Sequence, residues 1–383
     1  MLLGRYYDGL ELHREDKIIY AKFLSPHRVI STCRAAGGIT EEVDFVFNHQ
    51  SCEPAGHHES MPKSLWQDPI KYRELVADPY GLPAGKCAAL GTAANMNNAA
   101  VAEESFRRHH VVVAATGGVE CNAGRIGDPA PVYEEDGEYL SLDQDPPLAG
   151  TINTMVFINQ ELTPGALVRS IVTATEAKTA ALQELNVNSR YSSGQATGTG
   201  TDQVAIACRL GDAAPLSGAG KHCKLGELIG RNVKKAITQA LALQNELTPA
   251  GQCSARIHLE RFGASQERML TGICRYLDEK NAALLKENFT EIDRDPPTVA
   301  AMAALVHLWD KLTWGVLPES CRPEIMGSYG AQLAAAVSGK YERLSWYRNE
   351  LAPLPGADSA EDLLDLACKS MALGFSDKWT KQD

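Results

Sequence analysis

The stretch that decides the fold is residues 150–202, GTINTMVFINQELTPGALVRSIVTATEAKTAALQELNVNSRYSSGQATGTGTD. Its first part, residues 151–158, is rich in β-branched and aromatic side chains, which predicts a strand buried on both faces. Its last part, the glycine-threonine loop ATGTGTD, directly precedes the apolar run 204–208, which we expect to be the next strand. Such a loop exposes backbone N–H groups and allows a ligand to approach the main chain.

Between the strand and the loop, the sequence predicts one long helix. Thr163-Pro164 marks its start, because a hydroxyl at the N-cap accepts a backbone hydrogen bond and proline fits the first turn. The helix is expected to continue to about Leu185. Arg169, Ser170, Thr173 and Glu176 are expected to lie off the buried side. The apolar spacing predicts an inward stripe of Val168, Ile171, Val172, Thr175, Leu182 and Leu185.

Further strands and helices surround this stretch. Strands are predicted within residues 10–29 and at 43–47, 86–92 and 110–116, with a surface hairpin at 133–142. Asn97-Asn98 is expected to cap a helix to about Arg108, with Val101 and Phe106 inward. A second long helix is predicted at 224–243, with a buried side of Leu225, Leu228, Ile229, Val233, Ile237 and Leu241. Strands and helices in this alternation predict a layered α/β domain with a mixed sheet.

The composition of the chain changes around residues 248–251, where we place a domain boundary. It separates an α/β domain, residues 1–247, from an all-helical C-terminal region, residues 252–383. Helices are predicted there near 265–290, 298–314, 324–338, 340–351 and 359–373. We expect this region to form a homo-oligomer or to cover the α/β domain.

Charge and hydropathy limit the partners of the chain. The 37 Lys and Arg residues against 48 Asp and Glu give a net charge of −11, and no basic run is present. Nucleic acid is therefore not an expected partner. No apolar run approaches the ~18 residues that a membrane-spanning helix needs, and no signal peptide is evident, so we expect a cytoplasmic protein without membrane contact. The ten cysteines are scattered without a CxxC pair, which indicates packed thiols.

A family resemblance rests on motifs in a fixed order. GTIN, LTPGALVRSIVTATEAKTAALQEL, ATGTGTD and KLGELIGR resemble the adenosylcobinamide amidohydrolase family of corrinoid salvage enzymes. STCRAAGG at 31–38, FNHQ at 47–50 and ATGGVECNAGRIGD at 115–128 resemble its earlier blocks. The resemblance covers roughly residues 1–245, with an insert around 53–76, and the C-terminal region resembles nothing in the family.

The resemblance implies a hydrolase that cleaves a linear amide. The substrate is then adenosylcobinamide, whose aminopropanol (or its phosphate) is released to leave adenosylcobyric acid. The corrinoid is the substrate, so no cofactor is expected. Two alternatives remain open: a non-catalytic corrinoid-binding module, and an amidase or acyltransferase that uses a threonine nucleophile on another amide.

Amide hydrolysis requires a nucleophile, a base, an acid and donors for the oxyanion. Thr151 is the preferred nucleophile, because a Gly-Thr pair at a strand start resembles enzymes whose threonine is activated by its own amino group after self-cleavage. A threonine that simply opens a strand is the ordinary alternative, and Cys121 or a bound water are competing nucleophiles. His49 and Glu176 are the candidates for base and acid, against structural roles as a strand-end histidine and a solvated helix charge.

The remaining polar residues of the family blocks are candidates for substrate binding. The three threonines, two glycines and aspartate of the loop before residue 204 are candidate oxyanion donors, and the other side chains suit the amides and phosphate of the substrate. A polar loop network, a tight turn or a solvated loop is the alternative in each case. The set is Asn48, Asn122, Arg125, Asp128, Asn153, Thr197, Gly198, Thr199, Gly200, Thr201, Asp202 and Lys224.

A zinc site could be drawn from His57, His58 and Glu59 with His49 and Cys52 nearby. Adjacent histidines rarely point at one ion, so no metal site is predicted.

Overall fold

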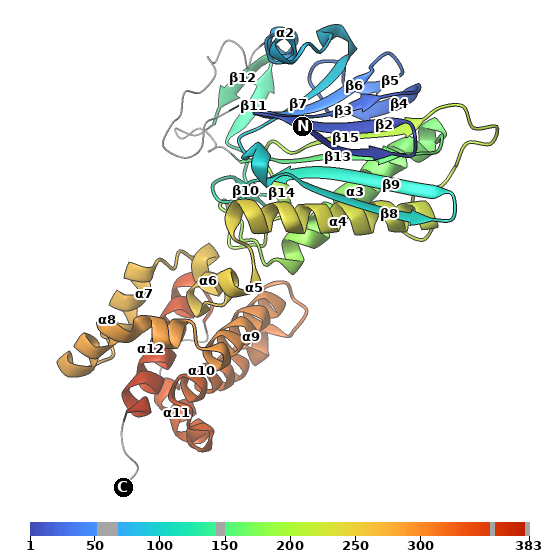
Figure 1. Ribbon diagram of the computed structural model, residues 1–383. Helices are drawn as coiled ribbons and strands as arrows, with labels where there is room; N and C mark the ends of the chain where they lie inside the picture. Colours follow the sequence, from blue (N-terminus) through green and yellow to red (C-terminus); the bar gives the residue numbers. More distant parts are fainter. Residues whose placement is uncertain (52–67, 143–149, 353–356, 380–383) are drawn as a thin grey trace. The chain divides into compact units, whose positions relative to one another are not determined.

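The computed structural model describes residues 1–51, 68–142, 150–352 and 357–379. It divides into two compact units, Met1–Leu247 and Thr248–Asp383. The first unit contains mixed sheets and the second contains helices, as predicted for the fold class (Figure 1). Each unit is described by itself.

Two sheets form the centre of the first unit (Figure 1). The first sheet, sheet A, has the order β1 (Leu2–Tyr6), β2 (Leu10–Glu15), β3 (Ile18–Phe23), β6 (Phe45–Gln50) and β7 (Cys87–Thr92). The second, sheet B, has the order β5 (Gly38–Thr40), β4 (His27–Ser31), β15 (Gln203–Arg209), β13 (Ile152–Ile158), β9 (His109–Gly117) and β8 (Ala100–Phe106). Only the pairs β6–β7 and β13–β15 are parallel among these neighbours, so both sheets are mixed.

Smaller elements complete the first unit. β10 (Ala123–Gly124) pairs with β14 (Gly198–Thr199), and β11 (Val132–Glu135) forms the predicted hairpin with β12 (Glu138–Ser141). The α-helices among the described residues of this unit are α2 (Pro69–Ala77), α3 (Pro164–Glu184) and α4 (Lys224–Asn245). Short 3₁₀ turns are η1 (Asp78–Tyr80), η2 (Ala84–Lys86) and η3 (Met96–Asn98).

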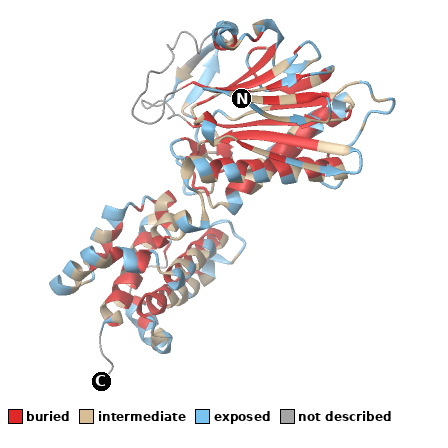
Figure 2. Ribbon diagram, in the orientation of Figure 1, coloured by how far each residue is buried: buried red, intermediate tan, exposed pale blue. Residues whose placement is uncertain are grey.

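These elements stack in four layers, because three apolar clusters separate them. Alternate residues of β13, Met155 and Phe157, pack with Val46 of sheet A. The intervening residues, Val156 and Ile158, pack against α3 and α4 on the other face. The outer face of sheet A is covered by α2. The order is therefore α2, sheet A, sheet B and the α3–α4 pair, with the buried residues concentrated between the layers (Figure 2).

The prediction of a helix from Asn97 to Arg108 was wrong. Residues 100–106 form β8, paired with β9 through a hairpin whose turn residue Arg107 has a φ of 53°. Ala100 and Ala102 are buried, which is the period-two pattern of a strand, whereas Phe106 is exposed. The adjacent charged residues Glu103 and Glu104 interrupt this alternation in the sequence.

The predicted span and cap of α3 are confirmed, but its buried side is rotated. The Thr163 side chain accepts a hydrogen bond from Ala166 N, as an N-cap does. Val168 and Val172, predicted inward, are exposed, whereas Ser170 and Thr173 are buried. The Thr173 hydroxyl donates to Ala219 O at 2.7 Å, so backbone from the loop before α4 satisfies it. All six residues predicted for the buried side of α4 are buried.

The second unit is helical and has its own core. It contains α5 (Pro249–Gln252), α6 (Ala255–Leu259), α7 (Gln266–Cys274), α8 (Glu279–Asp293), α9 (Pro296–Thr313), α10 (Arg322–Ser338), α11 (Leu344–Leu351) and α12 (Ala360–Lys378), with 3₁₀ turns η4 (Glu260–Phe262), η5 (Glu319–Cys321) and η6 (Tyr341–Arg343). The single helix predicted at 265–290 is two helices, because Asp278 caps a new one. Leu333, Tyr347 and Phe375 are fully buried in its core.

Two glycines of α4 give a matched test of its packing. A Cβ on Gly226 would lie 2.0 Å from Gly220 O, whereas a Cβ on Gly230 would meet nothing within 4 Å. We expect Gly226→Ala to lower the free energy of unfolding by at least about 2 kcal/mol, because the clash is with backbone. Gly230→Ala should raise it by about 0.5–1 kcal/mol through helix propensity. Urea unfolding measures both, and equal effects would contradict the close approach.

Candidate functional site

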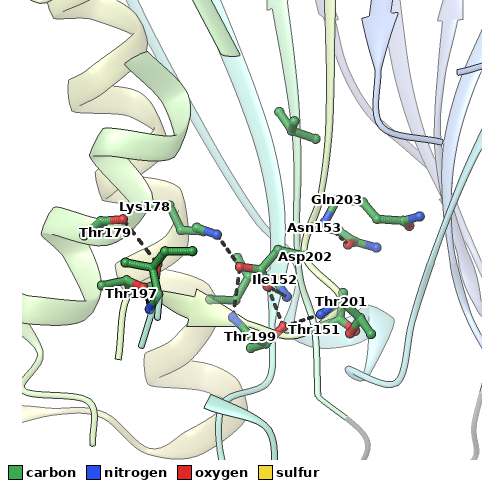
Figure 3. A network of polar contacts seen from close by, with 12 residues as sticks. Thr151, Ile152, Asn153, Lys178, Thr179, Thr197, Thr199, Thr201, Asp202 and Gln203 are labelled. Atoms are coloured by element: carbon green, nitrogen blue, oxygen red, sulfur yellow. Dashed lines mark hydrogen bonds and ion pairs between the residues drawn. The ribbon is translucent and has the colours of Figure 1, made fainter. Parts of the chain in front are cut away.

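Thr151 lies immediately before β13, where its hydroxyl meets another threonine. It is 6% exposed, and its Oγ1 lies 2.6 Å from Oγ1 of Thr201. β13 and β15 are parallel, so their amino ends are neighbours, which brings residues 151 and 201 together (Figure 3). Gly200 and Thr201 are exposed, so this end of the sheet reaches the surface through the loop.

The carboxylate of Asp202 holds this site together (Figure 3). Its Oδ1 accepts hydrogen bonds from Ile152 N at 2.9 Å and from the Thr199 hydroxyl at 2.6 Å. Its Oδ2 accepts from Thr199 N at 3.0 Å and forms an ion pair with Lys178 of α3. A Cβ on Gly198 would lie 2.5 Å from Asp202 Oδ2 and 2.7 Å from Lys178 Nζ, so a larger residue there would displace the ion pair.

The carbonyl oxygen of Gly150 accepts two hydrogen bonds. One comes from Asn122 Nδ2 at 3.0 Å and the other from the Thr201 hydroxyl at 2.8 Å. Tyr191 donates its hydroxyl proton to Asn122 Oδ1 at 2.6 Å, which directs the amide nitrogen toward Gly150. The predicted residues Asn122, Thr151 and Thr201 therefore form one cluster around the Gly150–Thr151 peptide.

Two buried asparagines join the site to sheet A. Asn153 donates to Asn48 Oδ1 at 2.8 Å and to Gly91 O at 2.9 Å. Asn48 in turn donates to Thr116 Oγ1 at 2.8 Å. Both asparagines are about 1% exposed, so they lie beneath Thr151 and fix the two sheets at this end.

Arg125 and Asp128 organise the loop beside the cluster. Asp128 Oδ2 accepts from Arg125 N at 2.7 Å and from the Ser189 hydroxyl at 2.6 Å. Burial alone would raise the pKa of Asp128, but hydrogen bonds from the Ser189 and Ser192 side chains and the Arg125 N–H lower it below its usual value. Arg125 Nη1 donates to a backbone carbonyl, and Thr197 Oγ1 accepts from the next N–H of this loop at 2.8 Å. The predicted residues of the two loops thus lie together.

His49 does not join this cluster. It alternates with Asn48 along β6, and its ring contacts Tyr72 of α2, with His49 Nδ1 and the Tyr72 hydroxyl 3.0 Å apart. It therefore lies on the outer face of sheet A, whereas Asn48 faces Asn153. Burial, together with the charge of Lys17, lowers the pKa of His49 to about 4.

Glu176 and Lys224 are also separated from Thr151. Glu176 is exposed on α3 and forms an ion pair with Lys221 at 3.1 Å. It is therefore a solvated helix charge, which was the alternative to a catalytic role. Lys224 begins α4, where its Nζ lies 4.7 Å from the centre of the Phe106 ring. Phe106 is the last residue of β8, and it lies at the same end of sheet B as Ile158, the last residue of β13. Lys224 therefore lies at the opposite end of β13 from Thr151.

Two residues that the sequence interpretation did not assign to the site lie in it, Lys178 and Tyr191. Lys178 follows the exposed Glu176 of α3 in the sequence. Two residues further along a helix, the side chain points in a different direction, and here it points to the glycine-threonine loop. Which residue of α3 faces the loop depends on how the helix packs. Cys121, the competing nucleophile, has an exposed side chain next to Asn122.

The structure gives no metal cluster in its described part. The histidines at 57 and 58, with Glu59 and Cys52, lie outside the described residues. Within residues 1–51, 68–142, 150–352 and 357–379, no group of three His, Cys, Asp or Glu side chains has the geometry to hold a metal ion.

The sequence comparisons cover the part of the chain that contains this cluster. The profile of the family described as adenosylcobinamide amidohydrolase matches residues 3–249, which include every residue of the site. The uncharacterized protein MJ1613 of Methanocaldococcus jannaschii is 34% identical over 246 residues, covering 61% of this chain and 89% of that protein. The chain belongs to the adenosylcobinamide amidohydrolase family. Its helical unit continues beyond the matched residues.

In the part of the chain that the structure describes, no helix combines the length and the apolar character that crossing a bilayer requires.

The burial of His49 generates a prediction for stability against pH. Its pKa is about 4 in the folded protein, against 6.5 ordinarily, so the unfolded chain takes up the proton first as the pH falls. Between pH 7 and 5 this should lower the free energy of unfolding by about 2 kcal/mol. His49→Gln should remove that part of the loss in urea unfolding at the two pH values. His222→Gln, which replaces an exposed histidine, is the control and should show the same loss of stability as the wild type. An unchanged loss in His49→Gln would contradict the assignment.

Proposed function

We propose that this protein hydrolyses the amide that joins aminopropanol, or its phosphate, to the corrin ring of adenosylcobinamide. The products are adenosylcobyric acid and the free amino alcohol. The observation that carries the proposal is the cluster around Thr151, built entirely from residues within the family-matched part of the chain. Family membership supports the substrate class, and the cluster supports amide chemistry.

Thr151 is the proposed attacking residue. Its hydroxyl is hydrogen-bonded to Thr201, which provides a first acceptor for the proton that leaves during attack. Asp202 and Lys178 contribute in a different way: they fix the start of β13 and the loop, so that the hydroxyl stays in one orientation. The cation of Lys178 also offsets the negative charge of Asp202 beside the reacting centre.

The surroundings of the cluster suit a bulky substrate with an apolar face and amide side arms. Ile126 is 86% exposed in the loop that contains Arg125 and Asp128, and it offers apolar contact next to polar groups. The loop residues Gly200 and Thr201 are also exposed, so their backbone groups are accessible to a ligand. Corrin side-chain amides would bind to such groups through hydrogen bonds.

The central test replaces the proposed nucleophile. Thr151→Ala should lower kcat by at least about a thousandfold, because removal of a nucleophile leaves only positioning and charge effects. Thr151→Ser keeps a hydroxyl and should stay within about tenfold of the wild type. Release of aminopropanol from adenosylcobinamide measures both, and unchanged turnover in Thr151→Ala would refute the assignment.

The same assay separates the alternative functions. Tight binding of adenosylcobinamide with no released aminopropanol would indicate a corrinoid-binding module. Turnover of another amide that adenosylcobinamide does not inhibit would indicate a different amidase. Glu176→Gln gives a further comparison, because its exposed ion pair with Lys221 predicts a change in kcat of less than about threefold.

A further inference from the structure

The peptide bond between Gly150 and Thr151 is held in an arrangement that favours its own cleavage. Asn122 Nδ2 and the Thr201 hydroxyl both donate to the Gly150 carbonyl oxygen, at 3.0 and 2.8 Å. Two donors on one carbonyl oxygen stabilise the oxyanion that forms when a nucleophile attacks its carbon. We propose that the chain cleaves its own Gly150–Thr151 bond and that the resulting N-terminal Thr151 is the active nucleophile.

The hydroxyl protons of the two threonines are ordered for this reaction. A hydroxyl has one proton to donate, and Thr201 donates it to Gly150 O. In the 2.6 Å contact between the two hydroxyls, Thr151 is therefore the donor and Thr201 Oγ1 the acceptor. The lone pairs of Thr151 Oγ1 remain for attack on the Gly150 carbonyl carbon, which closes a five-membered ring.

Both sides of the bond are anchored. On the Thr151 side, Gly118 N donates to Thr151 O at 3.1 Å and Ile152 N donates to Asp202 at 2.9 Å. On the other side, a Cβ on Gly150 would lie 2.9 Å from Asn122 Cβ and 3.0 Å from Gly118 O, so Asn122 and residue 118 approach closely only because the residue is glycine. Such fixed contact between reacting groups replaces a large part of the entropic barrier.

The reaction balances with water as the second reactant. Thr151 Oγ1 attacks the Gly150 carbon, and the proton of its hydroxyl is transferred to the Thr151 nitrogen as the C–N bond breaks. An ester between Gly150 and the Thr151 oxygen results. Water then hydrolyses this ester, which leaves the Gly150 carboxylate and restores the Thr151 hydroxyl beside a free α-amino group.

Cleavage would supply two things that amide hydrolysis needs, and this step rests on the proposed function. In the intact chain, Gly150 O occupies the donors on Asn122 and Thr201. Departure of Gly150 leaves them for the carbonyl oxygen of the substrate amide. The new α-amino group, with an ordinary pKa of about 8, is a base next to the hydroxyl, a position that neither His49 nor Glu176 occupies.

The test follows the mass of the full chain after synthesis in a purified, protease-free translation system. Denaturing mass spectrometry should show the wild type converting to fragments 1–150 and 151–383, whose masses sum to the chain plus one water. The conversion rate should not change with protein concentration, because the reaction is intramolecular. An uncleaved wild type, or cleavage at another bond, would overturn the proposal.

Variants show whether the named groups perform the step. Thr151→Ala should remain one chain, and Thr151→Ser should still cleave. Asn122→Ala, which removes one oxyanion donor, should slow conversion by about 100-fold. Thr163→Ala removes a hydroxyl from the N-cap of α3, away from the cleavage site, and should cleave at the wild-type rate. Circular dichroism establishes that each variant is folded, and cleavage of a folded Thr151→Ala chain would contradict the mechanism.

An assay of aminopropanol release on the same samples separates this proposal from the proposed function. An intact chain that hydrolyses adenosylcobinamide would overturn self-cleavage and leave the amidohydrolase standing. A chain cleaved at Gly150–Thr151 that leaves adenosylcobinamide intact would support self-cleavage and overturn the amidohydrolase function.

Discussion

The carboxylate of Asp202 is the interaction on which the site depends. It links the start of β13, the glycine-threonine loop and α3 through hydrogen bonds to Ile152 N, Thr199 and the ion pair with Lys178. The Asp202 and Lys178 side chains are 13% and 16% exposed, so each would be costly to hold there without the other. The pair thereby determines where the loop runs, and the loop places Thr201 against Thr151.

The strand directions explain why these segments meet. In open parallel sheets, ligands bind beyond the carboxyl ends of the strands. Here β13 and β15 contribute their amino ends, whereas β9, β6 and β7 contribute their carboxyl ends to the same region. Both α3 and α4 begin at the other end of sheet B, so no N-terminus of these two helices supplies positive charge at the cluster. The side chain of Lys178 provides it.

The helical unit has a different relation to the family. It continues after the matched residues and packs its own core, in which α10 and α12 approach closely at Gly374: a Cβ there would lie 2.4 Å from Ala334 O. Its folding is therefore specified by residues that the amidohydrolase part does not contain. A role in forming a homo-oligomer remains our proposal for it.

The sequence by itself determined the family, the fold class and most elements. β-Branched runs, the Thr163-Pro164 cap and the apolar spacing of α4 are local signals, and they predicted β13, α3 and α4 correctly. It also placed Thr151, Asn122, Thr201 and Asp202 among the candidates, because the family blocks contain them. Local signals failed where the structure depends on which strand pairs with a segment or on which side of a helix is buried. Residues 100–106 became a strand because β9 pairs with them, and α3 could bury Ser170 and Thr173 because both hydroxyls find backbone acceptors, Leu167 O within the helix and Ala219 O outside it.

Only the tertiary structure decided which candidates share a site. His49 and Asn48 are adjacent in sequence, but successive strand residues face opposite sides, so one packs against α2 and the other against Asn153. Glu176 and Lys178 are two residues apart on one helix, and only Lys178 reaches Asp202. The double donation to Gly150 O joins residues 122, 150 and 201, which are far apart along the chain. Spacing in sequence does not contain that information, because the pairing of distant strands creates it.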